Sequence, residues 1–124
     1  MPTTEQKLAA VNGYVDAFAK ADAEAVVALF DEQATVEDPV GTPIKRGHDE
    51  IRAFYAGSMA TGAKLELYGT PRCAADYVAF DFAVKLEWQG QKTVIDVIDT
   101  FRLNDDGKIV EMRAFWGPEN MKSV

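Results

Sequence analysis

Two kinds of hydrophobic periodicity divide the chain. In its first half, apolar side chains recur every three or four positions, the spacing of one face of an α-helix. From Val78 onward they alternate with polar side chains, which is the pattern of strands with one buried face. Helices followed by antiparallel strands predict an α+β fold in which the helices cover one side of a sheet.

Three helices are predicted in the first half, with a short strand over Ala34 to Asp38. Thr3 and Gln6 form a capping-box pattern at the start of the first helix, and Tyr14 lies on the flank of its apolar stripe. Asp22 can cap the second helix. The apolar positions of the three helices are Leu8, Val11, Val15 and Phe18; Val26, Leu29 and Phe30; and Ile51, Phe54, Tyr55 and Met59.

The second half predicts three long strands. Gln89-Gly90 turns the chain between the first two, and Asn104 to Gly107 turns it before the third. Each strand has one face of mainly apolar residues, which we expect to be buried. These faces are Val78, Phe80, Phe82, Val84, Leu86 and Trp88; Ile95, Val97, Asp99, Phe101 and Leu103; and Val110, Met112, Ala114 and Trp116.

Composition narrows the classes of function. The 124 residues are 48% hydrophobic, enough for the core of one domain over residues 1–124. With 20 acidic and 13 basic residues, the net charge of −7 disfavours nucleic acid and anionic membranes, so we expect neither as a partner. No apolar run approaches the length of a membrane span, and the first residues resemble no signal peptide, so we expect a cytoplasmic protein.

Counts of reactive residues exclude several kinds of site. His48 is the only histidine, expected in solvent near a helix start, and Cys73 is the only cysteine, expected in the core or a strand. We therefore expect no metal site built from cysteine and histidine, no hydrolytic triad and no intrachain disulfide.

Two inward-facing carboxyl groups remain as candidates for chemistry. Asp99 shares the buried face of its strand with Val97 and Phe101, and burial without a nearby cation favours the neutral acid, which can donate a hydrogen bond. The alternative is a core aspartate paired with backbone amides or an arginine. Asp38 shares the parity of Val36 and ends its strand, as a general base beside an apolar cleft would, although an Asp-Pro turn gives the same pattern.

Aromatic and apolar residues complete the candidate site. The Tyr14 phenol could project between helices and sheet, and Tyr55 could hydrogen-bond a neighbouring phenol, although such tyrosines often only pack. A larger set would suit a flat apolar ligand when taken together, although each member alone is an ordinary core residue. That set is Phe54, Phe82, Leu86, Met112 and Trp116.

Three segments of the sequence closely resemble the ketosteroid isomerases of the nuclear-transport-factor-2-like fold. Tyr14 lies in Gly-Tyr-Val-Asp-Ala-Phe, Asp38 in Ala-Thr-Val-Glu-Asp-Pro-Val-Gly, and Asp99 in Asp-Val-Ile-Asp-Thr-Phe-Arg. The spacing between the segments agrees as well, and the resemblance extends over essentially the whole chain.

The resemblance implies a conical barrel with three helices on a curved, mostly antiparallel sheet, a homodimer joined through sheet faces, and no cofactor. It also implies isomerisation of a 3-oxo-Δ5-steroid, a small apolar substrate, with Asp38 as general base. Tyr14 and a protonated Asp99 would donate hydrogen bonds to the steroid oxygen, and Tyr55 would support Tyr14. Phe30 stands where some relatives carry another tyrosine, so the chain of phenols would here be shorter.

Two other readings stay open, because the same fold serves different functions. One is an enzyme of the polyketide cyclase or dehydratase type, although such a site would ordinarily contain a histidine. The other is a binding module for an apolar ligand without catalysis. A binding module has no need of two inward acids and a tyrosine, and turnover would distinguish it from an enzyme.

Overall fold

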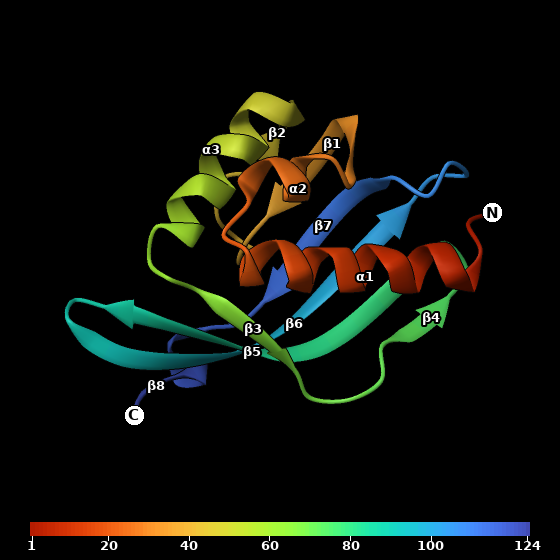
Figure 1. The fold of residues 1–124 in the computed structure, drawn as a ribbon. Coiled ribbons are helices and arrows are strands. Elements are labelled where there is room, and N and C mark those ends of the chain that lie inside the picture. The colour runs from red at the N-terminus through yellow and green to blue at the C-terminus, as the bar shows by residue number, and fades with distance from the viewer.

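Three helices cover one face of a curved sheet in the computed structural model of the chain, which describes residues 1–124 (Figure 1). The helices are α1 (Thr4–Ala19), α2 (Ala23–Val27) and α3 (Gly47–Met59). The strands are β1 (Phe30–Glu37), β2 (Lys45–Arg46), β3 (Lys64–Leu67), β4 (Arg72–Ala74), β5 (Tyr77–Trp88), β6 (Gln91–Leu103), β7 (Ile109–Phe115) and β8 (Met121–Ser123), and a short 3-10 helix, η1 (Pro118–Asn120), precedes β8. The predicted α+β class is confirmed.

The sheet is mixed and open. Its strands follow the order β2-β1-β7-β6-β5-β3, with β4 added beside β5 and β8 beside β6. Only β1 and β7 run parallel, and every other pair is antiparallel. The strongly curved sheet does not close on itself, because β2 and β3 remain at its two edges. The expected barrel is therefore a half-open one.

Helix α1 presents a slightly different face to the sheet than its hydrophobic pattern predicts. The capping box at Thr3 is present, but the buried stripe runs through Lys7, Val11 and Tyr14 to Phe18, so that Tyr14 lies at its centre and not on its flank. Lys7 is buried because its Nζ atom donates to the carbonyl oxygen of Ala75 at 2.6 Å. A lysine with a partner thus occupies a position that a hydrophobicity pattern assigns to the surface.

The long hairpin of β5 and β6 forms the floor beneath the helices. Phe80 pairs with Asp99, and the pairing continues without a break to Trp88 and Gln91 at the tip. The predicted inner face is confirmed over most of the hairpin. At its tip the prediction is wrong, because Trp88 is 50% exposed where the strands extend toward solvent.

An irregularity in β7 corrects another expected position. The pairing of β6 with β7 shifts by one residue between Arg102 and Leu103, so Leu103 pairs with Ile109 while Arg102 pairs with Glu111. Val110 is the extra residue at this bulge and is only partly buried. Ile109 takes the core position that the alternation predicts for Val110. Beyond the irregularity, Met112 and Ala114 follow the predicted alternation.

Smaller expectations are met in part. Cys73 is a half-buried free thiol in β4, as expected for a strand residue. His48 lies in the first turn of α3, but its ring is half-buried and hydrogen-bonded through Nε2 to the Phe30 carbonyl at 2.9 Å, not free in solvent. None of the helices has the length and apolar character needed to cross a membrane.

Candidate active site

A cavity of about 570 Å³ lies between the helices and the inner face of the β5-β6 hairpin. Fifteen of the 20 residues that line it are hydrophobic, so polar groups inside it are largely removed from water. The polar groups in the cavity include the phenols of Tyr14 and Tyr55 and the carboxyl groups of Asp38 and Asp99, which come from α1, α3, the end of β1 and β6. The fold therefore brings the four predicted polar residues to one apolar chamber.

The two phenols are joined to each other. The hydroxyl oxygens of Tyr14 and Tyr55 lie 2.9 Å apart, and both side chains are buried. Burial raises the pKa of Tyr14 well above its ordinary value, and negative charge on Tyr55, Asp99 or Asp38 would raise it further. Both phenols are thus held in the neutral state, in which they can donate hydrogen bonds. Phe30 packs with its ring centroid 6.0 Å from that of Tyr55 and extends the network no further.

Asp99 is buried without a hydrogen-bond partner. Its side chain is 1% exposed, and neither carboxyl oxygen has a partner in the protein. Burial raises the pKa of Asp99 well above its ordinary value, with a further rise from the charge of Asp38. No cation or backbone amide offsets the burial, so the alternative of a satisfied core aspartate is wrong. Burial thus favours the neutral acid at Asp99, whose carboxyl group lines the cavity.

Asp38 is placed by the parallel pairing of β1 with β7. That pairing sets Glu37 beside Arg113, and the amide of Val40 donates to the carbonyl of Ala114 at 2.9 Å. Asp38 consequently faces the cavity, whereas the Glu37 carboxylate accepts from Arg113 at 3.3 Å outside it. The predicted parity of the two acids is observed.

The carboxylate of Asp38 has one direct donor. Trp116 Nε1 donates to Asp38 Oδ1 at 2.9 Å. Burial raises the pKa of Asp38, while this hydrogen bond and the charge of Lys45 lower it in part. The Lys45 ammonium lies 5.0 Å from the ring centroid of Phe54, at the edge of the cavity. Asp38 is therefore a carboxylate with increased proton affinity that still has support for its charged form.

Four of the five predicted apolar contact residues line the cavity: Phe54, Phe82, Leu86 and Trp116. Met112 does not. It pairs with Val36 and Phe101 and is fully buried in the core. The cavity begins further along β7, where Ala114 pairs with Asp99. The predicted face of Met112 is therefore correct, but its side chain lies in the core below the cavity.

Sequence reasoning missed part of the lining and the main contact of Asp38. Val84, Ile95 and Val97 line the cavity on the predicted inner faces, so parity could have identified them. The bond from Trp116 to Asp38 joins residues 78 positions apart and carries no sequence signal.

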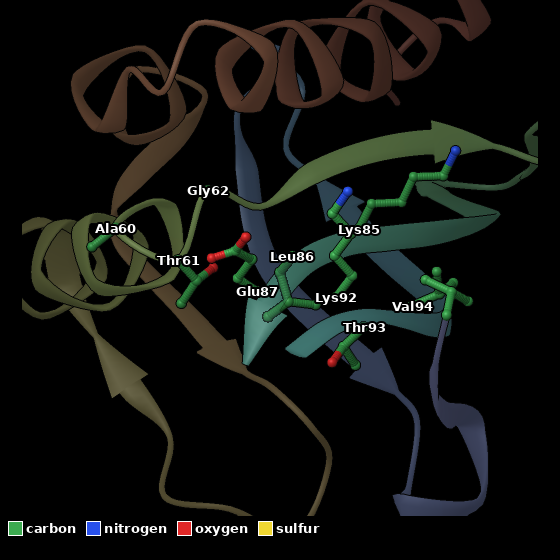
Figure 2. Close-up of a pocket in the computed structure, with 10 residues that line it drawn as sticks. Ala60, Thr61, Gly62, Lys85, Leu86, Glu87, Lys92, Thr93 and Val94 are labelled. Atoms are coloured by element: carbon green, nitrogen blue, oxygen red, sulfur yellow. The ribbon is translucent and has the colours of Figure 1, made fainter. Parts of the chain in front are cut away.

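A second depression, of about 790 Å³, lies beside the same hairpin (Figure 2). Lys85 and Glu87 line it, and they alternate along β5 with Val84 and Leu86 of the cavity, although Leu86 and Thr61 border both hollows. The side chains of Lys85 and Glu87 therefore point to the other face of the sheet. This depression contains no buried acid, and nowhere in the structure do histidine, cysteine and acidic side chains gather in a group suited to a metal ion.

The site combines one carboxylate with neutral hydrogen-bond donors inside an apolar cavity. Such a carboxylate can take a proton from carbon, and donors fixed in a dry site stabilise negative charge that forms on a nearby oxygen.

Comparisons with known proteins identify the family of the chain. Residues 11–112 match the SnoaL-like domain. The chain belongs to the SnoaL-like domain family. It is 39% identical over 113 residues to a steroid Delta-isomerase of Nocardioides simplex, covering 91% of each chain. Its fold is that of the nuclear-transport-factor-2-like proteins, and it superimposes with a TM-score of 0.92 on SalBIII, described as an epoxide hydrolase/cyclase-like enzyme in pyran ring formation in polyether salinomycin. The identity to SalBIII is 27%, and all of both chains is covered.

The hydrogen bond from Trp116 gives a first prediction. Trp116→Phe keeps an aromatic ring but removes the N–H that stabilises the Asp38 carboxylate, so the pKa of Asp38 should rise further. The measurement is a pH titration of the Asp38 carboxyl carbon by NMR. Trp88→Phe, at the cavity mouth, is the matched control and should leave the midpoint unchanged. An equal midpoint in parent and Trp116→Phe would contradict the assignment.

Proposed function

We propose that the chain is a steroid Δ-isomerase, which moves the double bond of a 3-oxo-Δ5-steroid into conjugation with the ketone. The observation that carries the proposal is the convergence of Asp38, Tyr14 and Asp99 on one apolar cavity. The 39% identical steroid Delta-isomerase supports it independently of the geometry. A cavity of about 570 Å³ has room for a tetracyclic substrate.

Asp38 is the general base of the proposed reaction. Its carboxylate removes a proton from the carbon between the ketone and the double bond. The electron pair of that C–H bond forms a new carbon-carbon double bond, and the π pair of the carbonyl moves onto the ketone oxygen to give the dienolate. Asp38 then returns the same proton to the far end of the dienolate, and the oxygen becomes a ketone again. Burial raises the proton affinity of Asp38, which brings it closer to that of the carbon acid.

Tyr14 and Asp99 are the proposed donors to the steroid oxygen. Both are neutral because of burial, and Asp99 has no competing partner in the protein. Two donors aimed at one oxygen stabilise the charge that develops in the transition state more than they stabilise the neutral ketone. Tyr55 would act through Tyr14, because a phenol that donates to the Tyr14 oxygen leaves the Tyr14 proton for the substrate.

A second candidate function is acid-base cyclisation of an apolar substrate that carries an epoxide. The close structural similarity to SalBIII over the whole chain favours it. A neutral Asp99 could protonate the epoxide oxygen while Asp38 deprotonates an attacking hydroxyl. The absence of a cavity histidine, which argued against a cyclase in the sequence, does not exclude this version, because two carboxyl groups supply acid and base. Turnover of a steroid substrate distinguishes the two candidates.

The quaternary structure is proposed to be a homodimer joined through the outer faces of the two sheets. Ile98 and Phe115 are cross-strand neighbours on the face opposite the helices and are 47% and 45% exposed. Acidic Asp96 lies two residues before Ile98 on β6, and basic Arg113 lies two residues before Phe115 on β7. A two-fold contact needs a surface complementary to itself, and an apolar centre flanked by both charges fits that requirement.

The proposed base gives the second prediction. Asp38→Asn cannot accept the proton, so conversion of a 3-oxo-Δ5-steroid should fall by on the order of a hundredfold or more, while binding of the conjugated product changes little. The assay follows the ultraviolet absorbance of the conjugated enone. Glu37→Gln, the adjacent carboxylate outside the cavity, is the control and should retain parent activity. Near-parent turnover by Asp38→Asn would eliminate Asp38 as the base.

A third prediction concerns the donor role of Asp99. Asp99→Asn keeps an N–H donor, whereas Asp99→Leu keeps none and should lose on the order of a hundredfold in kcat. The leucine variant should also be more stable at neutral pH by about 1 to 3 kcal/mol, because it removes a buried group without a partner. Loss of activity together with a higher Tm separates a donor from a structural residue. Equal activity of the two variants would return Asp99 to a structural role.

The homodimer gives the fourth prediction. Ile98→Glu places a charge at the centre of the proposed interface and should convert a dimer into a monomer in sedimentation equilibrium. Ile44→Glu is the matched control, because Ile44 is 41% exposed but lies before β2, away from that face. A parent chain that sediments as a monomer would refute the proposed interface.

A further inference from the structure

The cavity has a closed end and an open end along the hairpin. At the closed end, Asp99 pairs with Phe80, and both are almost fully buried. Along β5 the lining residues then become steadily more exposed, from buried Phe82 through half-buried Leu86 to exposed Trp88. A ligand whose oxygen lies at Asp99 therefore has its long axis directed toward Trp88.

This path is longer than a steroid nucleus. Eight residues separate Phe80 from Trp88 (88 − 80), and at about 3.3 Å per residue they span roughly 26 Å. Four fused rings built from carbon-carbon bonds of about 1.5 Å span about 10 Å. A nucleus held at Asp99 would end near the pair of Val84 with Ile95. The outer part of the lining, at Leu86 and beyond, would lie past its last ring.

The outer part of the cavity is apolar. Leu86, Trp88 and Met121 form its walls, and Trp88 offers a half-exposed indole. Trp88 and Met121 also line a neighbouring depression of about 280 Å³, together with Gln91 and Lys122 near the tip of the hairpin. The other residues of that depression are polar, so the apolar wall ends at Trp88 and Met121.

We infer that the outer end of the cavity, a side-chain channel with walls of Leu86, Trp88 and Met121, binds an aliphatic side chain on the ring of the steroid farthest from the ketone. The inference rests on the proposed function and refines its substrate class. Contact between methylene groups and an apolar wall beyond the nucleus increases the binding affinity, whereas a substrate that ends in a single oxygen makes no such contact. The preferred substrates are therefore 3-oxo-Δ5-steroids that retain an alkyl side chain on the terminal ring.

The test compares two conjugated product steroids by titration calorimetry. Androstenedione carries only an oxygen on its terminal ring, and 3-oxocholenic acid carries a five-carbon side chain. Each buried methylene is worth about fourfold in the binding constant, so the acid should bind at least about tenfold more tightly. The methyl ester of the acid should share this gain, which separates burial of the chain from attraction to Lys122.

Trp88→Ala tests the wall directly. The variant should reduce the ratio of the two binding constants to about threefold or less, because the chain loses the indole it packs against. Tyr77→Ala is the matched control, since Tyr77 is an exposed aromatic at the opposite end of β5 and should leave the ratio unchanged.

The outcomes separate this inference from the function on which it rests. Isomerisation of the androstene substrate with equal binding of all three products would overturn the side-chain channel alone. A ratio that persists in Trp88→Ala would overturn it as well. If no steroid is isomerised, both the proposed function and the inference fail. A tenfold preference that disappears in Trp88→Ala and persists in Tyr77→Ala supports the channel.

Discussion

Removal of acidic side chains from water is the physical constraint on which the site depends. Asp38, Asp99 and Tyr14 share one apolar cavity, and burial is the largest influence on the pKa of each. In water the two aspartates would both be ionised at neutral pH and would differ little. In the cavity burial raises the pKa of both, but their partners differ. Asp38 has an indole N–H and a nearby lysine charge, whereas Asp99 has neither.

The scaffold maintains this difference through pairings that are distant in sequence. The parallel register of β1 with β7 brings Asp38 within reach of Trp116, and the antiparallel register of β5 with β6 sets Asp99 beneath the helices. Helices α1 and α3 then cover the chamber and join their phenols above it. A strand is suited to such placement because a shift of one residue would turn every side chain to the other face.

Much of this arrangement could be predicted from alternation alone, because alternation reports on burial in strands. The inward positions of Asp38 and Asp99 follow from the parity of neighbouring apolar residues. What could not be predicted depends on contacts between elements. Lys7 is buried with a hydrogen bond from its Nζ atom to a carbonyl in the turn before β5, and Tyr14 lies at the centre of the buried stripe of α1. The irregularity near Val110 has no marker in the sequence. Whether Met112 lines the cavity or lies in the core depends on where along β7 the cavity begins, which the alternation does not report.

The separation of the two acids also explains how charge would move in the proposed reaction. Before it, the cavity holds one negative charge on Asp38, near the Trp116 donor. As the proton leaves carbon, Asp38 becomes neutral and the charge appears on the substrate oxygen beside Tyr14 and Asp99. The net charge of the cavity stays constant, so no ion has to enter or leave a dry chamber. The charge that leaves Asp38 therefore builds up on the oxygen that Tyr14 and Asp99 would face. Their hydrogen bonds to that oxygen strengthen as its negative charge grows, which is the condition for stabilising the transition state selectively.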